Sequence, residues 1–138
     1  MSPLLFLILL PIVGALLAIA GFPARRVAIA AAAANVALSA GLLFSFDFTA
    51  SGYQLVTSCP VVPSLGIAFT LGADGLSLAV LLLSTVVTLA AVCVARPPQT
   101  NSAWFYTCLL FISAGAIGAF ASVDAFFFYM FHELALVP

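Results

Sequence analysis

Long apolar runs dominate this chain and decide what it can fold into. An α-helix needs ~20 consecutive apolar residues to cross the hydrocarbon core of a membrane. Four such runs are present, at residues 3–21, 27–46, 75–95 and 103–121. Hydrophobic residues make up 66% of the chain and charged residues only 5%, which leaves too few polar groups to cover the surface of a soluble domain. We therefore predict an all-α, multi-pass integral membrane protein.

A fifth apolar run begins at Ala125 and continues to Pro138. A helix of that length rises ~21 Å, which is less than the ~30 Å thickness of the hydrocarbon core. We therefore expect the helix at 125–138 to be incomplete. We expect residues 1–138 to be a single membrane domain that forms the amino-terminal part of a larger protein.

The segment 47–74 is expected to be a loop on the outer side of the membrane. Glycine and proline residues divide it into short pieces. The piece from Gly66 to Gly72 fits either one arm of a β-hairpin or an irregular surface loop, and the sequence leaves both open.

The few charged side chains lie mostly at the ends of the apolar runs, and their signs are ordered. The arginines are Arg25, Arg26 and Arg96, and the aspartates are Asp47, Asp74 and Asp124. If every run crosses once, the arginines lie on one side of the membrane and the aspartates on the other. Because cytoplasmic loops are enriched in basic residues, we expect the N-terminus outside. We also expect the bacterial inner (cell) membrane as the location. A secretory signal peptide would require a basic side chain before the first run, and the sequence has none there.

Several residues within the runs predict how the helices pack. Pro11 removes a backbone hydrogen bond from the first helix, which is tolerated where a neighbouring helix binds the freed carbonyl. Gly115 and Gly118, with Ala114 and Ala119, have the small-xxx-small spacing that brings two helices close together. Four polar positions are expected either to bond to other helices or to hold water: Asn35, Ser84, Thr85 and Thr88.

Glu133 is the only glutamate, and it lies deep in the fifth apolar run. If that helix begins near Asp124, Glu133 lies about 13 Å below the outer surface. A carboxylate near the middle of a bilayer costs ~3 kcal/mol on insertion scales, so such groups are rare and usually handle ions or protons. An apolar environment favours the protonated form of a carboxyl group, which suits proton uptake and release. We predict proton transfer at Glu133, against the alternative of a structural acid bonded to a neighbouring helix.

Tyr129 and His132 are weaker candidates for a relay with Glu133. Tyr129 is one helical turn before Glu133 on the same face, and His132 is about 100° around the helix. A lone histidine is more often a packing residue than a metal ligand, so we expect no metal site. We also expect no cofactor-binding residue in this chain. The three cysteines form no Cys-x-x-Cys pair, and we expect them to pack as ordinary small apolar side chains: Cys59, Cys93 and Cys108.

Two stretches resemble a known family. Leu71-Gly-Ala-Asp-Gly-Leu-Ser-Leu78 resembles the Leu-Gly-x-Asp-Gly-hydrophobic-Ser start of the third helix in antiporter-like membrane subunits. The segment from Ser122 to Pro138 is similar to their fifth helix, commonly written Asp-Leu-Leu-Leu-Phe-Tyr-x-Phe-Trp-Glu-x-x-Leu-Ile-Pro, with His132 in place of the usual tryptophan. The chain is most similar to the N-terminal part of the M-chain group (subunit 4 in mitochondria) of respiratory complex I, the proton-translocating NADH:quinone oxidoreductase.

The resemblance implies the first helices of an antiporter-like multi-span subunit, in which Glu133 is a central ionisable residue of the proton pathway. In that family the glutamate works with a lysine on a later helix, and this chain contains no lysine. No redox catalysis is expected in this chain. NADH, FMN, iron–sulfur clusters and quinone are expected in partner subunits of the enzyme complex.

The expected partners are the other membrane-arm subunits and the lipid bilayer. Nucleic acid is not expected, because the net charge is −1 and no basic cluster is long enough to bind it. Membrane-bound hydrogenases and multi-subunit cation/proton antiporters share the architecture, so a subunit of either remains an alternative. A small non-transporting membrane scaffold is a further alternative.

Overall fold

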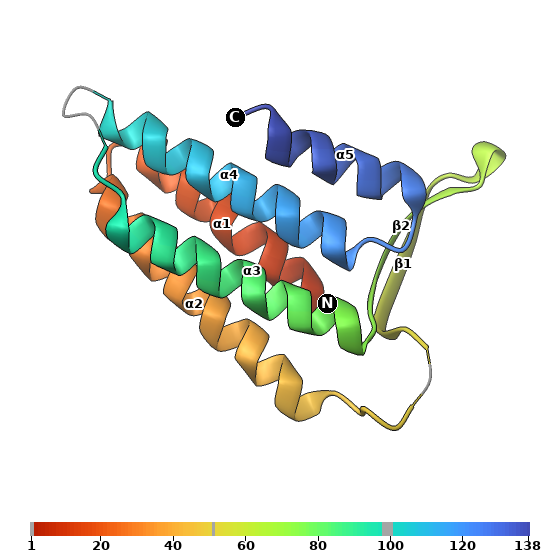
Figure 1. Ribbon diagram of the computed structural model, residues 1–138. Helices are drawn as coiled ribbons and strands as arrows, with labels where there is room; N and C mark the ends of the chain where they lie inside the picture. Colours follow the sequence, from red (N-terminus) through yellow and green to blue (C-terminus); the bar gives the residue numbers. More distant parts are fainter. Residues whose placement is uncertain (1, 51, 98–100) are drawn as a thin grey trace.

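The computed structural model describes residues 2–50, 52–97 and 101–138, with the backbone alone at Leu65. Residues 1, 51 and 98–100, which fall within the expected domain and its outer loop, lie outside the described residues. Helices and a two-stranded sheet follow one another along the chain (Figure 1). The elements are α1 (Pro3–Ile19), α2 (Ala24–Ser45), β1 (Gln54–Val62), the short 3-10 helix η1 (Pro63–Leu65), β2 (Ile67–Ala73), α3 (Gly75–Val94), α4 (Ser102–Ala121) and α5 (Ala125–Leu136). The predicted all-α membrane class is confirmed, with a β-hairpin added at one end.

The helix α4 lies at the centre of the bundle. It packs against α1, α2, α3 and α5, and its buried residues run from Tyr106 to Ala121. The other large helix contacts join α1 to α2 and α2 to α3. Figure 1 shows α5 alongside α4 on the outside of this group. The position of α5, and of the residues it carries, therefore depends on its contact with α4.

Three helices, α2, α3 and α4, are long and apolar enough to cross a membrane, and α1 and α5 are shorter apolar helices. The α1–α2 connection, the end of α3 and the start of α4 lie at one end of the bundle, and the hairpin and the α4–α5 turn lie at the other (Figure 1). We call these the arginine end and the hairpin end. The first holds Arg25, Arg26 and Arg96, and the second holds Asp47, Asp74 and Asp124. Large apolar side chains such as Leu83 and Val87 remain exposed between the two ends, as in helices that face lipid.

Asn35 compensates for the hydrogen bond that Pro11 removes from α1. Proline has no backbone N–H, so the carbonyl of Leu7, four residues earlier, loses its helical partner. The buried side chain of Asn35 on α2 donates from Nδ2 to that carbonyl at 3.2 Å. The expectation that a neighbouring helix binds the freed carbonyl is therefore confirmed. Within the described residues, Asn35 Oδ1 has no hydrogen-bond partner.

Hydroxyl groups also join α2, α3 and α4 in the interior of the bundle. Ser39 Oγ on α2 and Thr85 Oγ1 on α3 lie 2.9 Å apart. One turn along α3, Thr88 Oγ1 lies 3.1 Å from Ser113 Oγ on α4. Of the two expectations for these polar residues, bonding to other helices is confirmed for Asn35, Thr85 and Thr88. Such bonds fix the rotation of each helix against its neighbours.

Residues 54–73 form a β-hairpin, so the irregular loop is the wrong alternative for this segment. Strand β1 pairs with β2 in antiparallel register, with Ser58 opposite Thr70 and Cys59 opposite Phe69. Gly66 sits at the turn with φ of +68°, a left-handed conformation that favours glycine. The start of α1 is tied to this hairpin, because Ser2 Oγ donates to the Leu55 carbonyl at 3.4 Å.

Asp74 ends the hairpin and begins α3. Its Oδ1 accepts a hydrogen bond from the Ser77 backbone N–H at 2.7 Å. Hydrogen bonds from the backbone and side chain of Ser77 lower the pKa of Asp74 below its ordinary value. The Asp-Gly-Leu-Ser sequence is therefore a helix cap, which supplies an acceptor to an amide that has none within the helix.

Replacing Asn35 with leucine will destabilise the protein, because the Leu7 carbonyl is then left without a donor in an apolar interior. We expect a loss of about 1–2 kcal/mol in the free energy of unfolding. Replacing Pro11 with alanine restores a backbone N–H at this turn. Asn35→Leu should therefore cost much less in a Pro11→Ala background, as measured by unfolding of the purified full-length protein in detergent.

Ser45→Ala is the control for this double-mutant cycle. The Ser45 hydroxyl is exposed and bonds to Gly41 within the same helix, so its loss should change stability little in either background. Equal costs of Asn35→Leu with and without Pro11 would show that Asn35 does not act through the Leu7 carbonyl.

Candidate functional site

The candidate site lies on α5, and Asp124 sets where that helix begins. Asp124 Oδ1 accepts hydrogen bonds from the backbone N–H groups of Phe126 at 2.8 Å and Phe127 at 3.4 Å. Just before it, Ser122 Oγ donates to the Gly118 carbonyl at the end of α4 at 2.8 Å. These bonds satisfy backbone groups that helix ends leave unpaired. They close the turn that sends α5 back along α4.

The hairpin holds this turn from the other side. The Val123 N–H donates to the Thr70 carbonyl on β2 at 3.0 Å. The Phe69 ring of β2 lies 4.9 Å from the Phe127 ring and 6.2 Å from the Phe131 ring, measured between centroids. Because Phe127 and Phe131 are one turn apart on α5, these contacts fix the rotation of the first half of the helix.

Gly115 and Gly118 allow α5 to lie directly against α4. A Cβ atom on Gly115 would lie 2.6 Å from the Ala135 backbone nitrogen and 2.7 Å from the Phe131 carbonyl oxygen. A Cβ atom on Gly118 would overlap the Phe131 ring. The small-xxx-small spacing read from the sequence therefore does bring two helices into close contact, and the second helix is the one that carries Glu133.

Glu133 is half-buried and lies on the side of α5 that points away from α4. Phe131 and Ala135, which meet α4, are two positions before and after it. Two residues correspond to about 200° of helix rotation, so Glu133 lies nearly opposite both. Within the described residues, its carboxylate makes no side-chain hydrogen bond and no salt bridge. A partner for this carboxylate is therefore not supplied by the described part of the chain.

Tyr129 and His132 lie on the same outer side of α5 as Glu133. The centroids of the Tyr129 and His132 rings are 6.2 Å apart with an interplanar angle of 28°. Tyr129 is 63% exposed, and His132 is also exposed. No hydrogen bond joins the three side chains within the described residues. The helix thus gathers three proton-binding groups on one side, without linking them to one another.

No group of three or more His, Cys, Asp or Glu side chains with the spacing of a metal site occurs in the part of the chain that the structure describes. The cysteines are free: Cys59, Cys93 and Cys108. The site on α5 is therefore one of protonatable side chains, and Glu133 is its only acidic member.

Two relatives are chain 4 proteins of NAD(P)H-quinone oxidoreductase. NAD(P)H-quinone oxidoreductase chain 4 of the chloroplast of Chara vulgaris is 39% identical over 95 residues, which cover 69% of this chain and 19% of the relative. The chain 4 protein of Gloeobacter violaceus is 34% identical over 136 residues, which cover 96% of this chain and 26% of the relative. This chain is homologous to the amino-terminal part of NAD(P)H-quinone oxidoreductase chain 4.

A solved structure is similar to almost the whole chain. A chain of the respiratory complex I from Thermus thermophilus with bound NADH matches 98% of this chain with a TM-score of 0.81 at 27% identity. That match covers 27% of the Thermus chain. No protein-family model matches the sequence. The chain therefore spans about a quarter, or less, of the length of the chain 4 proteins to which it is similar.

Alanine at Gly115 or Gly118 will push α5 away from α4, because the new methyl group meets backbone at the first position and the Phe131 ring at the second. We expect a loss of about 1–3 kcal/mol in stability, the usual cost of overpacking. The unfolding temperature of the full-length protein in detergent measures the effect.

Gly41→Ala is the matched control, because Gly41 lies in α2 and a Cβ atom added there would meet no atom within 4 Å. Alanine there should leave stability unchanged or raise it slightly, as glycine is a poor helix former. If Gly115→Ala behaves like Gly41→Ala, then α4 and α5 do not pack as closely as described.

Proposed function

We propose that the full-length protein is a proton-translocating membrane subunit of an NADH:quinone oxidoreductase. The observation that carries this proposal is the fold match to a chain of respiratory complex I over 98% of this chain. The redox reaction takes place in partner subunits, which hold NADH, FMN, iron–sulfur clusters and quinone. This chain couples that reaction to proton movement and holds no redox centre. Its partners are the other membrane-arm subunits and the lipid bilayer.

Glu133 is the residue to which we assign the transferred proton. The three aspartates lie outside the helices at the hairpin end, whereas Glu133 lies within α5. A positive charge brought near a carboxyl group favours its ionised form, and removal of that charge favours proton uptake. Electron transfer in partner subunits shifts charge along the membrane arm, and Glu133 releases and rebinds its proton in response.

Tyr129 and His132 are assigned supporting positions in the same path. The Tyr129 hydroxyl both donates and accepts hydrogen bonds, and an imidazole can carry a proton near neutral pH. Their shared side of α5 with Glu133 supports this role. A route through them requires water or polar groups from another part of the full-length protein, because the three side chains are not bonded to one another.

The orientation we propose places the arginine end in the cytoplasm and the hairpin and N-terminus outside. The separation of all arginines from all aspartates supports it, through the enrichment of basic residues in cytoplasmic loops. We propose the bacterial inner (cell) membrane as the location, with residues 1–138 as one membrane domain whose helices cross the bilayer. The similarity to the Gloeobacter violaceus protein is consistent with a bacterial setting.

Glu133→Gln in the intact complex tests the assigned role. Glutamine keeps the size and hydrogen bonding of the side chain but cannot exchange a proton. Acid–base groups that transfer protons typically contribute 10²-fold or more to a rate, so we expect the rate of NADH-driven proton translocation to fall at least about tenfold. The measurement is NADH-driven acidification of inverted membrane vesicles, with complex content checked on native gels.

Two control variants separate proton transfer from assembly. Glu133→Asp keeps a titratable group and should retain part of the proton translocation. Asp47→Asn removes a carboxylate from the hairpin end, where Asp47 bonds to Thr49, and should leave translocation unchanged. Normal proton translocation by Glu133→Gln would contradict the role given to this residue.

A further inference from the structure

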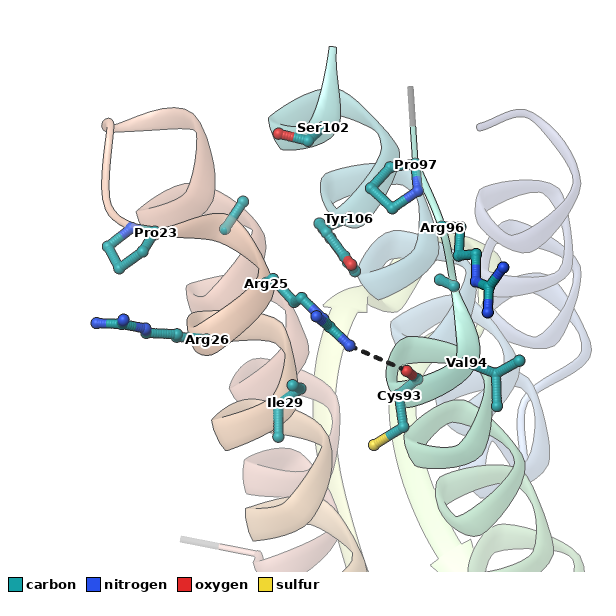
Figure 2. A pocket seen from close by; sticks show the side chains of 12 residues that line it. Pro23, Arg25, Arg26, Ile29, Cys93, Val94, Arg96, Pro97, Ser102 and Tyr106 are labelled. Carbon is teal, nitrogen blue, oxygen red and sulfur yellow. Dashed lines mark hydrogen bonds between the residues drawn. The ribbon is translucent and has the colours of Figure 1, made fainter. Parts of the chain in front are cut away.

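A pocket opens at the arginine end, on the opposite end of the bundle from the start of α5. It lies between the first turn of α2, the last turn of α3 and the first turns of α4, and its volume is about 1190 Å³. Figure 2 shows Arg25 reaching across it from α2 toward the Cys93 carbonyl of α3, to which its Nη2 donates at 3.3 Å. Tyr106 of α4 stands behind Arg25 in the same pocket.

Positive charge in this pocket has no counter-charge in the described chain. Apart from His132, the sequence contains three basic side chains, and all three line the pocket: Arg25, Arg26 and Arg96. The aspartates lie at the hairpin end and Glu133 lies on α5. Two helices also begin here, α2 and α4, and neither has a side-chain cap or an acidic residue in its first turn. Helix N-termini carry partial positive charge, so the pocket is electropositive from both sources.

Tyr106 supplies an independent sign that the pocket takes a ligand. The side chain is 1% exposed, and its hydroxyl has no hydrogen-bond partner within the described residues. Figure 2 shows that hydroxyl turned into the space between Arg25 and the end of α3. A buried hydroxyl without a partner is unfavourable. An oxygen atom placed beside Arg25 would accept hydrogen bonds from both groups.

We propose that this pocket binds the phosphate group of an anionic phospholipid, with Arg25 and Tyr106 as its direct ligands. A guanidinium group presents paired N–H donors that match phosphate oxygens. Basic pockets between membrane helices are suited to anionic head groups. The volume is sufficient for more than a bare phosphate, since a water molecule occupies about 30 Å³.

The surroundings favour a lipid as the source of the phosphate. The pocket lies where three apolar helices end, which is the level of the lipid head groups. Trp104, in the first turn of α4, is 62% exposed, and tryptophan is enriched at this level of a membrane. Val94, which lines the pocket, is 78% exposed, and Phe22, which precedes Pro23 of the lining, is 57% exposed. Apolar surface is therefore available to acyl chains. This site is independent of the proposed proton path on α5.

Lipid binding to the full-length protein tests the proposal. The protein is purified in a neutral detergent, and bound lipid is counted by native mass spectrometry after addition of phosphatidylglycerol or of phosphatidylcholine. We expect one phosphatidylglycerol to bind in preference to phosphatidylcholine. Arg25→Gln should weaken that binding about tenfold or more, and Tyr106→Phe about threefold, because each removes a hydrogen bond to the phosphate.

Arg26→Gln is the charge-matched control, since Figure 2 shows Arg26 pointing away from Tyr106 and Arg25. Its effect should stay within about twofold if binding depends on direct contacts rather than on net charge. Equal losses from Arg25→Gln and Arg26→Gln would overturn the proposal. So would equal binding of the two lipids, or displacement of phosphatidylglycerol by millimolar inorganic phosphate, which would indicate a site for a free anion.

Tyr106→Phe keeps the test decisive if Arg25→Gln does not fold. Without lipid, this variant should be at least as stable as the parent protein, because it removes an unpartnered hydroxyl. With phosphatidylglycerol, the parent should gain more thermal stability than the variant. An equal gain in both proteins would show that Tyr106 does not contact the head group and would overturn its assignment.

Discussion

Backbone N–H and C=O groups inside a membrane have no water to bond to, so each must be paired within the protein. Most of this chain meets that requirement with helices. Where a helix is interrupted or ends, a side chain takes over. Asn35 binds the carbonyl that Pro11 leaves free, and Asp74 and Asp124 cap α3 and α5. The strands pair with each other beyond the ends of the helices (Figure 1).

The central place of α4 follows from its small residues and determines what α5 can do. Gly115 and Gly118 let the backbone of α5 approach α4 more closely than a side chain at either position would allow. The face of α5 that carries Phe131 and Ala135 packs against α4. Glu133 is thereby turned to the side of α5 that points away from α4. The proton path that we propose depends on this packing as much as on the carboxylate itself.

The two ends of the bundle differ in charge and in the chemistry they support. The aspartates at the hairpin end are bonded locally to backbone and hydroxyl groups, such as Asp74 to Ser77. The arginines at the other end have no acidic partner in the described chain, and the buried Tyr106 hydroxyl beside them is unbonded. An anionic lipid at that end would anchor the helices in the head-group layer, without involving the titratable groups of α5.

Hydropathy and motif by themselves determined the membrane class, the approximate helices and the family resemblance, and they singled out Glu133 as the candidate for proton transfer, because these features depend on residues close together in the chain. The same patterns predicted that the carbonyl freed by Pro11 and the small face at Gly115 would have partners, but not which ones. Only the tertiary structure decided that Asn35 meets Leu7, that Gly115 meets α5, that Glu133 faces away from α4, and that Tyr106 joins Arg25 in one pocket. Those pairings depend on the rotation of each helix, and that rotation is set by packing between segments far apart in sequence.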